Sequence, residues 1–261
     1  MSAVALTRPT PAATSGAHTR PGLARLTLVE LRKMTDTSAG FWLLASVVVI
    51  TVIAVAVTAA VADAADRDFR TMMSVALQPA SVLLPVVGVL LVTSEWSQRT
   101  GQITFALIPD RSRVLVAKLL ASIVLGLAAV LLSLAAAAAA TAVGGADVKG
   151  TWSYGPELLL QAVVYVVTGM ITGVAFGAAL LASAPALVAY FTLPFAGAAV
   201  FSMSVFAGVA PWLDMVRTIG PMAEEVLSAA GWARAGTALA LWMVLPLLIG
   251  AWRITRRDIT A

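Results

Sequence analysis

The amino-acid sequence predicts an all-α, polytopic membrane protein. Of its 261 residues, 60% are hydrophobic and only 11% are charged, and the mean hydropathy is +0.95. Soluble domains are typically about 45–50% apolar and about 25% charged, so this composition excludes a water-soluble globule and a wholly disordered chain. The apolar residues form long unbroken runs, unlike the alternating strands of outer-membrane β-barrels. Helices are therefore the expected spanning elements.

The first 22 residues predict a disordered cytoplasmic tail. Pro9, Pro11 and Pro21 are separated by Thr, Ser and Ala residues, a composition that cannot bury a core. The single histidine, His18, lies in this tail and is interpreted as a bystander. The chain has no cysteine, which excludes disulfides and thiolate sites.

Residues 23–37 predict an N-terminal helix. Leu23, Leu31 and Met34 fall toward one face of it, and Arg25 and Arg32 fall opposite. Such a helix is expected to lie in the membrane interface with its basic residues toward phosphates. The alternative is an ordinary basic segment beside the membrane.

Six apolar runs follow, and each supplies nearly the roughly 20 residues that a spanning helix needs. They cover residues 41–62, 74–93, 115–143, 158–182, 187–208 and 237–252. Runs four and five are separated only by Ser183–Ala186, which predicts a tight helical hairpin broken at Pro185. Interior prolines predict kinks in spans two, five and six, since spanning helices tolerate proline. They are Pro79, Pro85, Pro194 and Pro246.

Three glycines on span four, Gly169, Gly173 and Gly177, fall on one helical face. Small residues at this spacing allow helices to approach closely. We interpret them as packing contacts within the chain, and a contact between two copies of the chain is the alternative.

The distribution of charge predicts the topology. With six spans both termini lie on one side, and twelve of the seventeen Lys and Arg residues fall there. The five on the other side are Arg67, Arg70, Lys149, Arg217 and Arg234. By the positive-inside rule the termini are cytoplasmic, in a multi-pass protein of the cytoplasmic (inner) membrane. The basic composition is thus a topology signal, and no nucleic-acid partner is needed to explain it.

The six apolar cores contain no Asp, Glu, His or Arg. Ionisable residues within spans usually mark ion or proton pathways, so their absence argues against a proton-coupled carrier, an ion pump and an intramembrane protease. The nearest charge, Lys118, is expected to snorkel at the inner end of span three. No phosphate-binding G-x-x-x-x-G-K-[ST] motif is present. We therefore expect no catalytic residue, no metal site and no cofactor in this chain.

The segment between spans two and three, residues 94–118, mixes apolar anchors with Glu and Arg. Pro109 would end a short helix over about residues 100–107. A short helix held against the membrane is a suitable docking surface for a soluble partner, and an interfacial loop is the alternative.

This segment carries a family resemblance. Glu95-Trp96, then Arg99-Thr100-Gly101, then Pro109-x-Arg111-x-x-Val114-x-x-Ala117-Lys118 resembles the ABC-2 type permeases, the membrane subunits of ATP-binding-cassette exporters. Glu30-Leu31-Arg32-Lys33 before span one and Arg253-x-x-Arg256-Arg257-Asp258 after span six are similar to the same family.

The resemblance implies six spans, an interfacial N-terminal helix and a cytoplasmic coupling helix between spans two and three, within a permease domain over residues 23–261. It implies a second permease subunit, identical or different, and cytoplasmic ATPase subunits that bind ATP and Mg²⁺. Lys118 would anchor the base of span three. The residues that would build or position the ATPase-docking element are Glu95, Arg99, Thr100, Gly101, Phe105, Pro109 and Arg111.

Spans two and five are, by the same resemblance, nearest the substrate path. The residues they offer include Gln78, Ser81, Phe195, Phe201, Ser202 and Ser204, and aromatic side chains with a few hydroxyls suit amphipathic cargo. Packing or lipid contact is the alternative for each. The external loop, residues 209–236, contains Gly220-Pro221 and then Glu224 and Glu225, which predicts a helix start. That helix is either re-entrant or interfacial, or an ordinary external helix.

The leading hypothesis is thus a non-catalytic permease subunit that exports a drug, antibiotic, peptide or lipid. Some members of the family it resembles confer multidrug resistance. Two alternatives remain. One is a secondary transporter, and the other is an integral membrane protein without a transport role.

Overall fold

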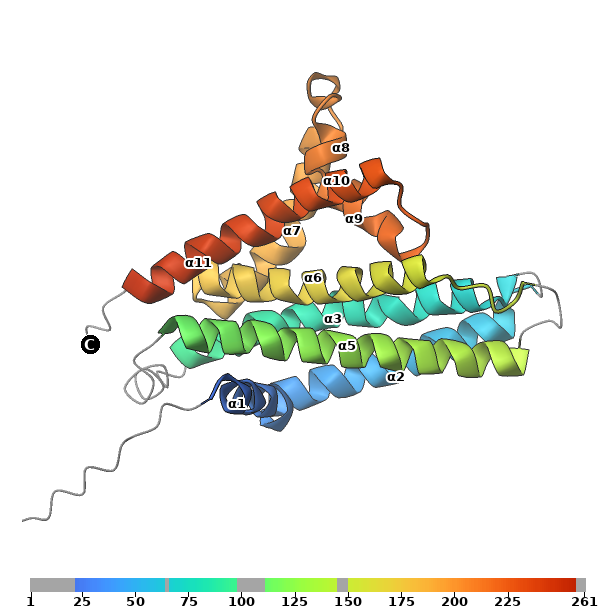
Figure 1. Cartoon of the computed structure of the whole chain (residues 1–261), viewed down its shortest axis with the longest axis horizontal. Coiled ribbons are helices and arrows are strands. Elements are labelled where there is room, and N and C mark those ends of the chain that lie inside the picture. Colours follow the sequence, from blue (N-terminus) through green and yellow to red (C-terminus); the bar gives the residue numbers. More distant parts are fainter. Residues whose placement is uncertain (1–21, 64–65, 98–110, 145–149, 257–261) are drawn as a thin grey trace, which may run out of the picture.

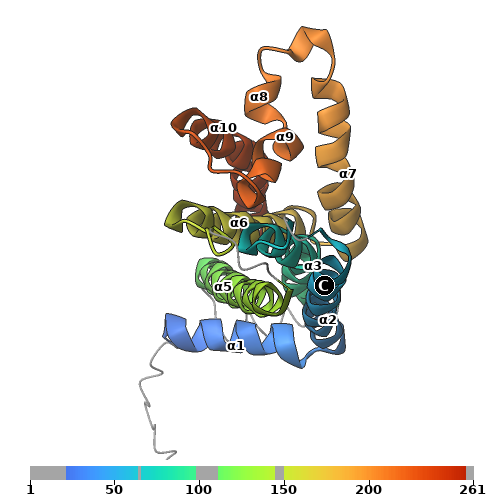
Figure 2. The same cartoon turned by 90° about the vertical axis from the view of Figure 1, so that its right-hand side faces the viewer.

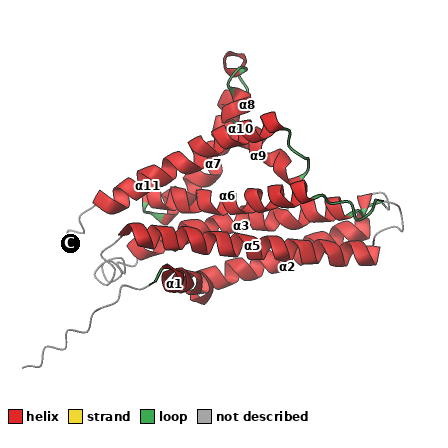
Figure 3. Cartoon of the chain, viewed as in Figure 1, coloured by secondary structure: helices red, strands yellow, loops and turns green. Residues whose placement is uncertain are grey.

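The computed structural model describes residues 22–63, 66–97, 111–144 and 150–256, and these form helices with no strand among them (Figures 1 and 3). The α-helices are α1 (Leu23–Asp36), α2 (Ser38–Val61), α3 (Phe69–Ser97), α5 (Arg111–Gly144), α6 (Pro156–Leu180), α7 (Ser183–Phe201), α8 (Ala210–Leu213), α9 (Met215–Ile219), α10 (Ala229–Leu239) and α11 (Leu245–Arg256). The 3₁₀ turns η2 (Ser204–Phe206) and η3 (Gly220–Ala223) lie beside α8 and α9, and the π-helical turn η4 (Ala240–Val244) joins α10 to α11.

Among the described residues, six helices are long and apolar enough to cross a membrane, as the sequence predicts. They cover Ser38–Val61, Phe69–Trp96, Arg111–Gly144, Pro156–Leu180, Ser183–Phe201 and Ala229–Thr255. The predicted ends of two spans are wrong. Span five ends at Phe201 rather than at residue 208, and span six begins at Ala229 rather than at residue 237. Ser228 explains the second difference, because its side chain caps the new helix by accepting from the Gly231 N–H at 3.2 Å.

Helices α3 and α6 form the centre of the bundle, and α2, α5 and α11 pack around them (Figure 1). The large fully buried side chains of this core include Met72, Met73 and Leu77 of α3 and Met170 of α6. Helix α1 runs across the bundle against α5 and α2, so Figure 1 shows it end-on and Figure 2 from the side. The extended backbone of Thr37 makes this turn, and its hydroxyl accepts from the Gly40 N–H that begins α2.

The glycine stripe of span four packs against α3 within the chain. A Cβ on Gly173 would meet the backbone of Pro85, and one on Gly177 would lie 3.0 Å from the Val89 carbonyl oxygen. Gly88 of α3 faces α6 in the same way. The interpretation as internal packing is confirmed, because only the missing side chains let the two backbones approach.

The hairpin between spans four and five is also confirmed, but its break is not at Pro185. Helix α6 ends at Leu180, and Leu181 takes a left-handed conformation with φ 55° that caps it. Helix α7 starts at Ser183. Pro185 therefore lies in the first turn of α7, where a missing N–H costs no helical hydrogen bond.

Helix α7 leaves the bundle and leads to α8 (Figure 2). Ala186 is the one buried residue of α7. Two of the interior prolines lie inside the continuous helix α3 and one inside α7. Pro246 is the second residue of α11, just after η4. A π turn at this place accommodates the carbonyl that proline leaves without its usual hydrogen-bond partner.

The prediction that a helix begins at Gly220-Pro221 is wrong. Residues Gly220–Ala223 form a single 3₁₀ turn, and the next helix begins only at Ala229. The buried side chain of Gln161, on α6, explains this. Its amide NH₂ donates to the carbonyls of Met222 and Glu225, and its oxygen accepts from the Leu227 N–H. These bonds hold the chain in a turn that a continuous helix would not allow.

Candidate functional site

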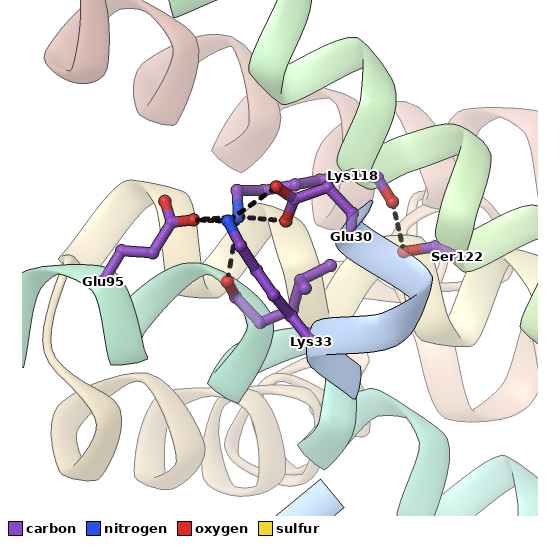
Figure 4. A network of polar contacts seen from close by, with 6 residues as sticks. Glu30, Lys33, Glu95, Lys118 and Ser122 are labelled. Carbon is purple, nitrogen blue, oxygen red and sulfur yellow. Dashed lines mark hydrogen bonds and ion pairs between the residues drawn. The ribbon is translucent and has the colours of Figure 1, made fainter. Parts of the chain in front are cut away.

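Four charged side chains meet at one end of the bundle, where α1, the end of α3 and the beginning of α5 come together. Glu30 and Lys33 come from α1, Glu95 from α3 and Lys118 from α5 (Figure 4). We refer to these four residues as the charge cluster. Its formal charge is zero, with two carboxylates and two ammonium groups.

Lys118 occupies the centre of the cluster. Its ammonium group lies 2.7 Å from Glu30 Oε2, 2.9 Å from Glu95 Oε1 and 3.1 Å from the Leu91 carbonyl oxygen. A lysine ammonium has three N–H donors, and each of these has an acceptor here. Lys33 completes the cluster at 2.8 Å from Glu30 Oε1 and 2.7 Å from Glu95 Oε1.

The three central residues are buried, with relative exposures of 3% for Lys118, 4% for Glu30 and 5% for Glu95. The expectation that Lys118 snorkels to water is therefore wrong. Its ammonium is held inside by two carboxylates that lie far away in sequence. A buried charge is tolerated when it is paired and fully hydrogen-bonded, and the ammonium group of Lys118 meets both conditions.

Lys33 lies at the edge of the cluster, with its side chain 36% exposed. Burial by itself lowers the pKa of this lysine. The charges of Glu95 and Glu30 and the hydrogen bonds to both outweigh that effect, so the pKa of Lys33 is raised above its ordinary value of 10.5. The ammonium is thus the stable form throughout the physiological range.

The burial pattern of α1 explains how Glu30 reaches the cluster. The buried residues of α1 are Leu26, Glu30 and Met34, spaced four apart. Side chains at this spacing share one helical face. The predicted apolar face contained Met34 correctly, but Leu23 is exposed. An acid in the middle of an otherwise apolar stripe is the signal in the sequence that points to a buried partner.

The cluster joins the two ends of the segment that carries the family resemblance. Glu95 lies near the end of α3 and Lys118 in the second turn of α5, so their ion pair links both sides of residues 98–110. Arg99, Thr100, Gly101, Phe105 and Pro109, and the predicted coupling helix over residues 100–107, lie outside the described residues. Arg111 is described, and its guanidinium donates to the Ile254 carbonyl at 2.9 Å. This bond connects α5 to α11.

The residues predicted for a substrate path lie on α3, on α7 and just after α7. On α3, Gln78 is exposed and Ser81 donates to the Gln78 carbonyl at 2.8 Å. On α7, Phe195 is 66% exposed and Ser202 donates to the Ala199 carbonyl at 2.6 Å.

Phe201 and Ser204 lie where α7 ends. Phe201 packs edge-on against Phe206, with ring centroids 6.1 Å apart. Ser204 is exposed in η2. Phe195, Ser202 and Ser204 are thus exposed and Phe201 is half-buried. Their role in substrate binding stays a prediction.

No group of three or more His, Asp or Glu residues in the described part of the chain is placed to hold a metal ion. Comparison with known proteins gives no matching family model and no matching curated protein.

Proposed function

We propose that this chain is the membrane subunit of an ATP-driven exporter of the ABC-2 type, which moves a hydrophobic or amphipathic substrate across the cytoplasmic membrane. ATP hydrolysis takes place in a separate subunit. The observation that carries the proposal is the charge cluster, which ties α1 to both sides of the segment at residues 98–110. That segment carries the motif resembling the ATPase-docking element.

A docking element transmits force only when its base is firmly held. The cluster supplies such a base, because four short contacts with N···O distances of 2.7–3.1 Å connect α1, α3 and α5. Movement of the docking segment would then be passed to the spanning helices rather than absorbed in a loop. In this role Glu95 is a positioning residue, since its buried carboxylate is bound by two lysines.

The first experiment tests for the partner. The chain is co-expressed with any P-loop ATPase that its neighbouring reading frames encode, purified in detergent and reconstituted in liposomes. We expect the two proteins to co-purify, and we expect ATP hydrolysis to rise with one class among lipids, peptides and antibiotics. An ATPase whose P-loop lysine is replaced serves as the control. Transport driven by a proton gradient without any ATPase would contradict the proposal and favour a secondary transporter.

The second experiment tests the positioning role. Glu95→Gln removes one carboxylate charge from the cluster, and we expect substrate-stimulated ATP hydrolysis to fall at least about tenfold, as for loss of a buried charge pair. Glu157→Gln changes an exposed acid at the opposite end of the bundle and is the matched control. Arg99→Ala, within the predicted docking segment, is expected to abolish co-purification. If both variants co-purify and hydrolyse ATP normally, the docking assignment is wrong.

A further inference from the structure

A pocket of about 340 Å³ lies at the end of the bundle opposite the charge cluster. One wall is formed by Pro211, Arg217 and Thr218 in the region of α8 and α9. The other is formed by the turn 225–228 and by Arg234 of α10. The pocket plays no part in the function proposed above.

The wall of this pocket is held rigidly by the bundle. Gln161, which is 0% exposed, fixes the turn through hydrogen bonds of 3.2, 2.6 and 2.8 Å to Met222, Glu225 and Leu227. Arg70 of α3 adds a bond of 2.9 Å from its Nε to the Glu224 carbonyl. The pocket is therefore a preformed feature, since a buried side chain with all these bonds leaves the turn little freedom.

Two arginines supply positive charge to the pocket. Arg217 has a side chain 60% exposed, and its nearest acid is Asp214 at 4.0 Å, beyond hydrogen-bond distance. The guanidinium of Arg234 lies 5.9 Å from the ring centroid of Trp212, a cation–π contact that uses none of its N–H donors. Glu225 is the one acid among the described residues that line the pocket. Guanidinium groups with free donors match the geometry of phosphate oxygens.

The surroundings of the pocket are apolar. Trp212, Val216 and Val226 are all exposed, and Val226 lines the pocket itself. Tryptophan and arginine side by side are typical of the level at which lipid headgroups lie. From this combination we propose that the pocket binds the phosphate of a membrane phospholipid, with Arg217 and Arg234 as its ligands and the acyl chains against the adjoining apolar surface.

Thermal unfolding of the full chain in dodecyl maltoside micelles tests the proposal. A ligand that binds only the folded state raises the unfolding midpoint, and the stabilisation grows with the logarithm of 1 + [L]/Kd. Dioleoyl phosphatidylglycerol is expected to raise the midpoint, whereas dioleoylglycerol, which lacks the phosphate, is not. Inorganic phosphate at the same concentration is expected to raise it less. An equal rise with inorganic phosphate would show that a free anion is the ligand, and that result overturns the lipid assignment.

The arginines are tested by substitution. Replacing both with Gln (Arg217→Gln with Arg234→Gln) is expected to weaken phosphatidylglycerol binding by about tenfold or more, the effect of losing a charge-assisted hydrogen bond. Arg67→Gln is the control, because Arg67 lies at the same end, donates to the Ala62 carbonyl and is outside the pocket. Unchanged affinity in the double variant would overturn the proposal.

A second variant covers the case in which the double variant does not fold. Glu225→Gln removes the acid from the pocket and is expected to tighten phosphatidylglycerol binding by about two- to threefold, since a nearby like charge opposes the phosphate. A gain in affinity cannot arise from misfolding. Unchanged or weaker binding in this variant counts against the proposal.

Discussion

The ammonium group of Lys118 is the most constrained charge in the described part of the chain. Its three donors are all used, by Glu30, by Glu95 and by the Leu91 carbonyl. In the low-dielectric interior an ion pair contributes to stability only when this kind of complete pairing offsets the cost of removing both ions from water. Removing one partner is therefore expected to lower the free energy of unfolding more than removing all the buried charges together.

Lys118→Met tests this asymmetry. The variant leaves two carboxylates buried with only Lys33 to pair them, and we expect a loss of about 3–5 kcal/mol in the free energy of unfolding. The triple variant Lys118→Met, Glu30→Gln, Glu95→Gln removes all the buried charge and is expected to be more stable than Lys118→Met alone. Unfolding midpoints in detergent give the comparison. A triple variant less stable than the single one would contradict the argument.

Lys33 makes a pH-dependent contribution. Its pKa is raised in the folded protein above the ordinary value of 10.5, so its stabilisation is complete below that value and is lost as the pH rises through the folded pKa. The difference in unfolding midpoint between the wild type and Lys33→Met is expected to stay constant from pH 7 to about pH 10, below the ordinary pKa, and to shrink above it. A difference that already shrinks near pH 8 would speak against the ion pairs.

At the scale of elements, the contact between α3 and α6 organises the bundle. It depends on glycines of both helices, because backbone atoms of one helix lie where side chains of the other would be. Dispersion attraction between closely packed backbones replaces the hydrophobic driving force, which is absent between helices in lipid. This contact places the buried residues of α3 against α6.

Gly173→Ala and Gly169→Ala form a matched pair on α6. A Cβ at Gly173 collides with the Pro85 backbone, whereas one at Gly169 lies 3.9 Å from the nearest Pro85 atom, an ordinary contact. Gly173→Ala is expected to cost about 1–3 kcal/mol through overpacking. Gly169→Ala is expected to be neutral, or to stabilise by up to about 1 kcal/mol through helix propensity. Thermal midpoints distinguish them, and equal effects would show that the close approach is not what matters.

At the scale of the whole molecule, the charge cluster and the pocket lie at opposite ends of six apolar helices. By the positive-inside rule we expect the end with the cluster to face the cytoplasm. The pocket would then face the outside. Its proposed phospholipid would accordingly come from the outer leaflet.

The absence of cysteine makes this topology simple to test. Single substitutions Thr35→Cys on α1 and Ala230→Cys on α10 each introduce the chain's one thiol at an exposed position. We expect a membrane-impermeant maleimide to label Ala230→Cys in intact cells, and to label Thr35→Cys only after the membrane is opened. The reverse pattern would invert the orientation and place the charge cluster outside.

The sequence by itself determined the fold class, the number of spans and the site of the hairpin. These follow from composition and from unbroken apolar runs, which depend on residues close together in the chain. It also identified the glycine stripe, because spacing on one helix is a local property. The end of span five and the beginning of span six were missed. The beginning of span six depends on the Ser228 cap, which lies before the apolar run at 237–252, and on a turn held by Gln161 of another helix.

Only the tertiary structure decided that Glu30, Glu95 and Lys118 are buried together. Glu30 and Lys118 are 88 residues apart in sequence, and hydropathy treats each of them as a charge that belongs in water. The burial of an ion pair depends on at least two helices, because each charge is tolerated in the interior only when an opposite charge from another helix pairs with it. The same holds for Arg217 and Arg234, which count as two outer charges in the sequence and become a phosphate site only where α9 and α10 meet.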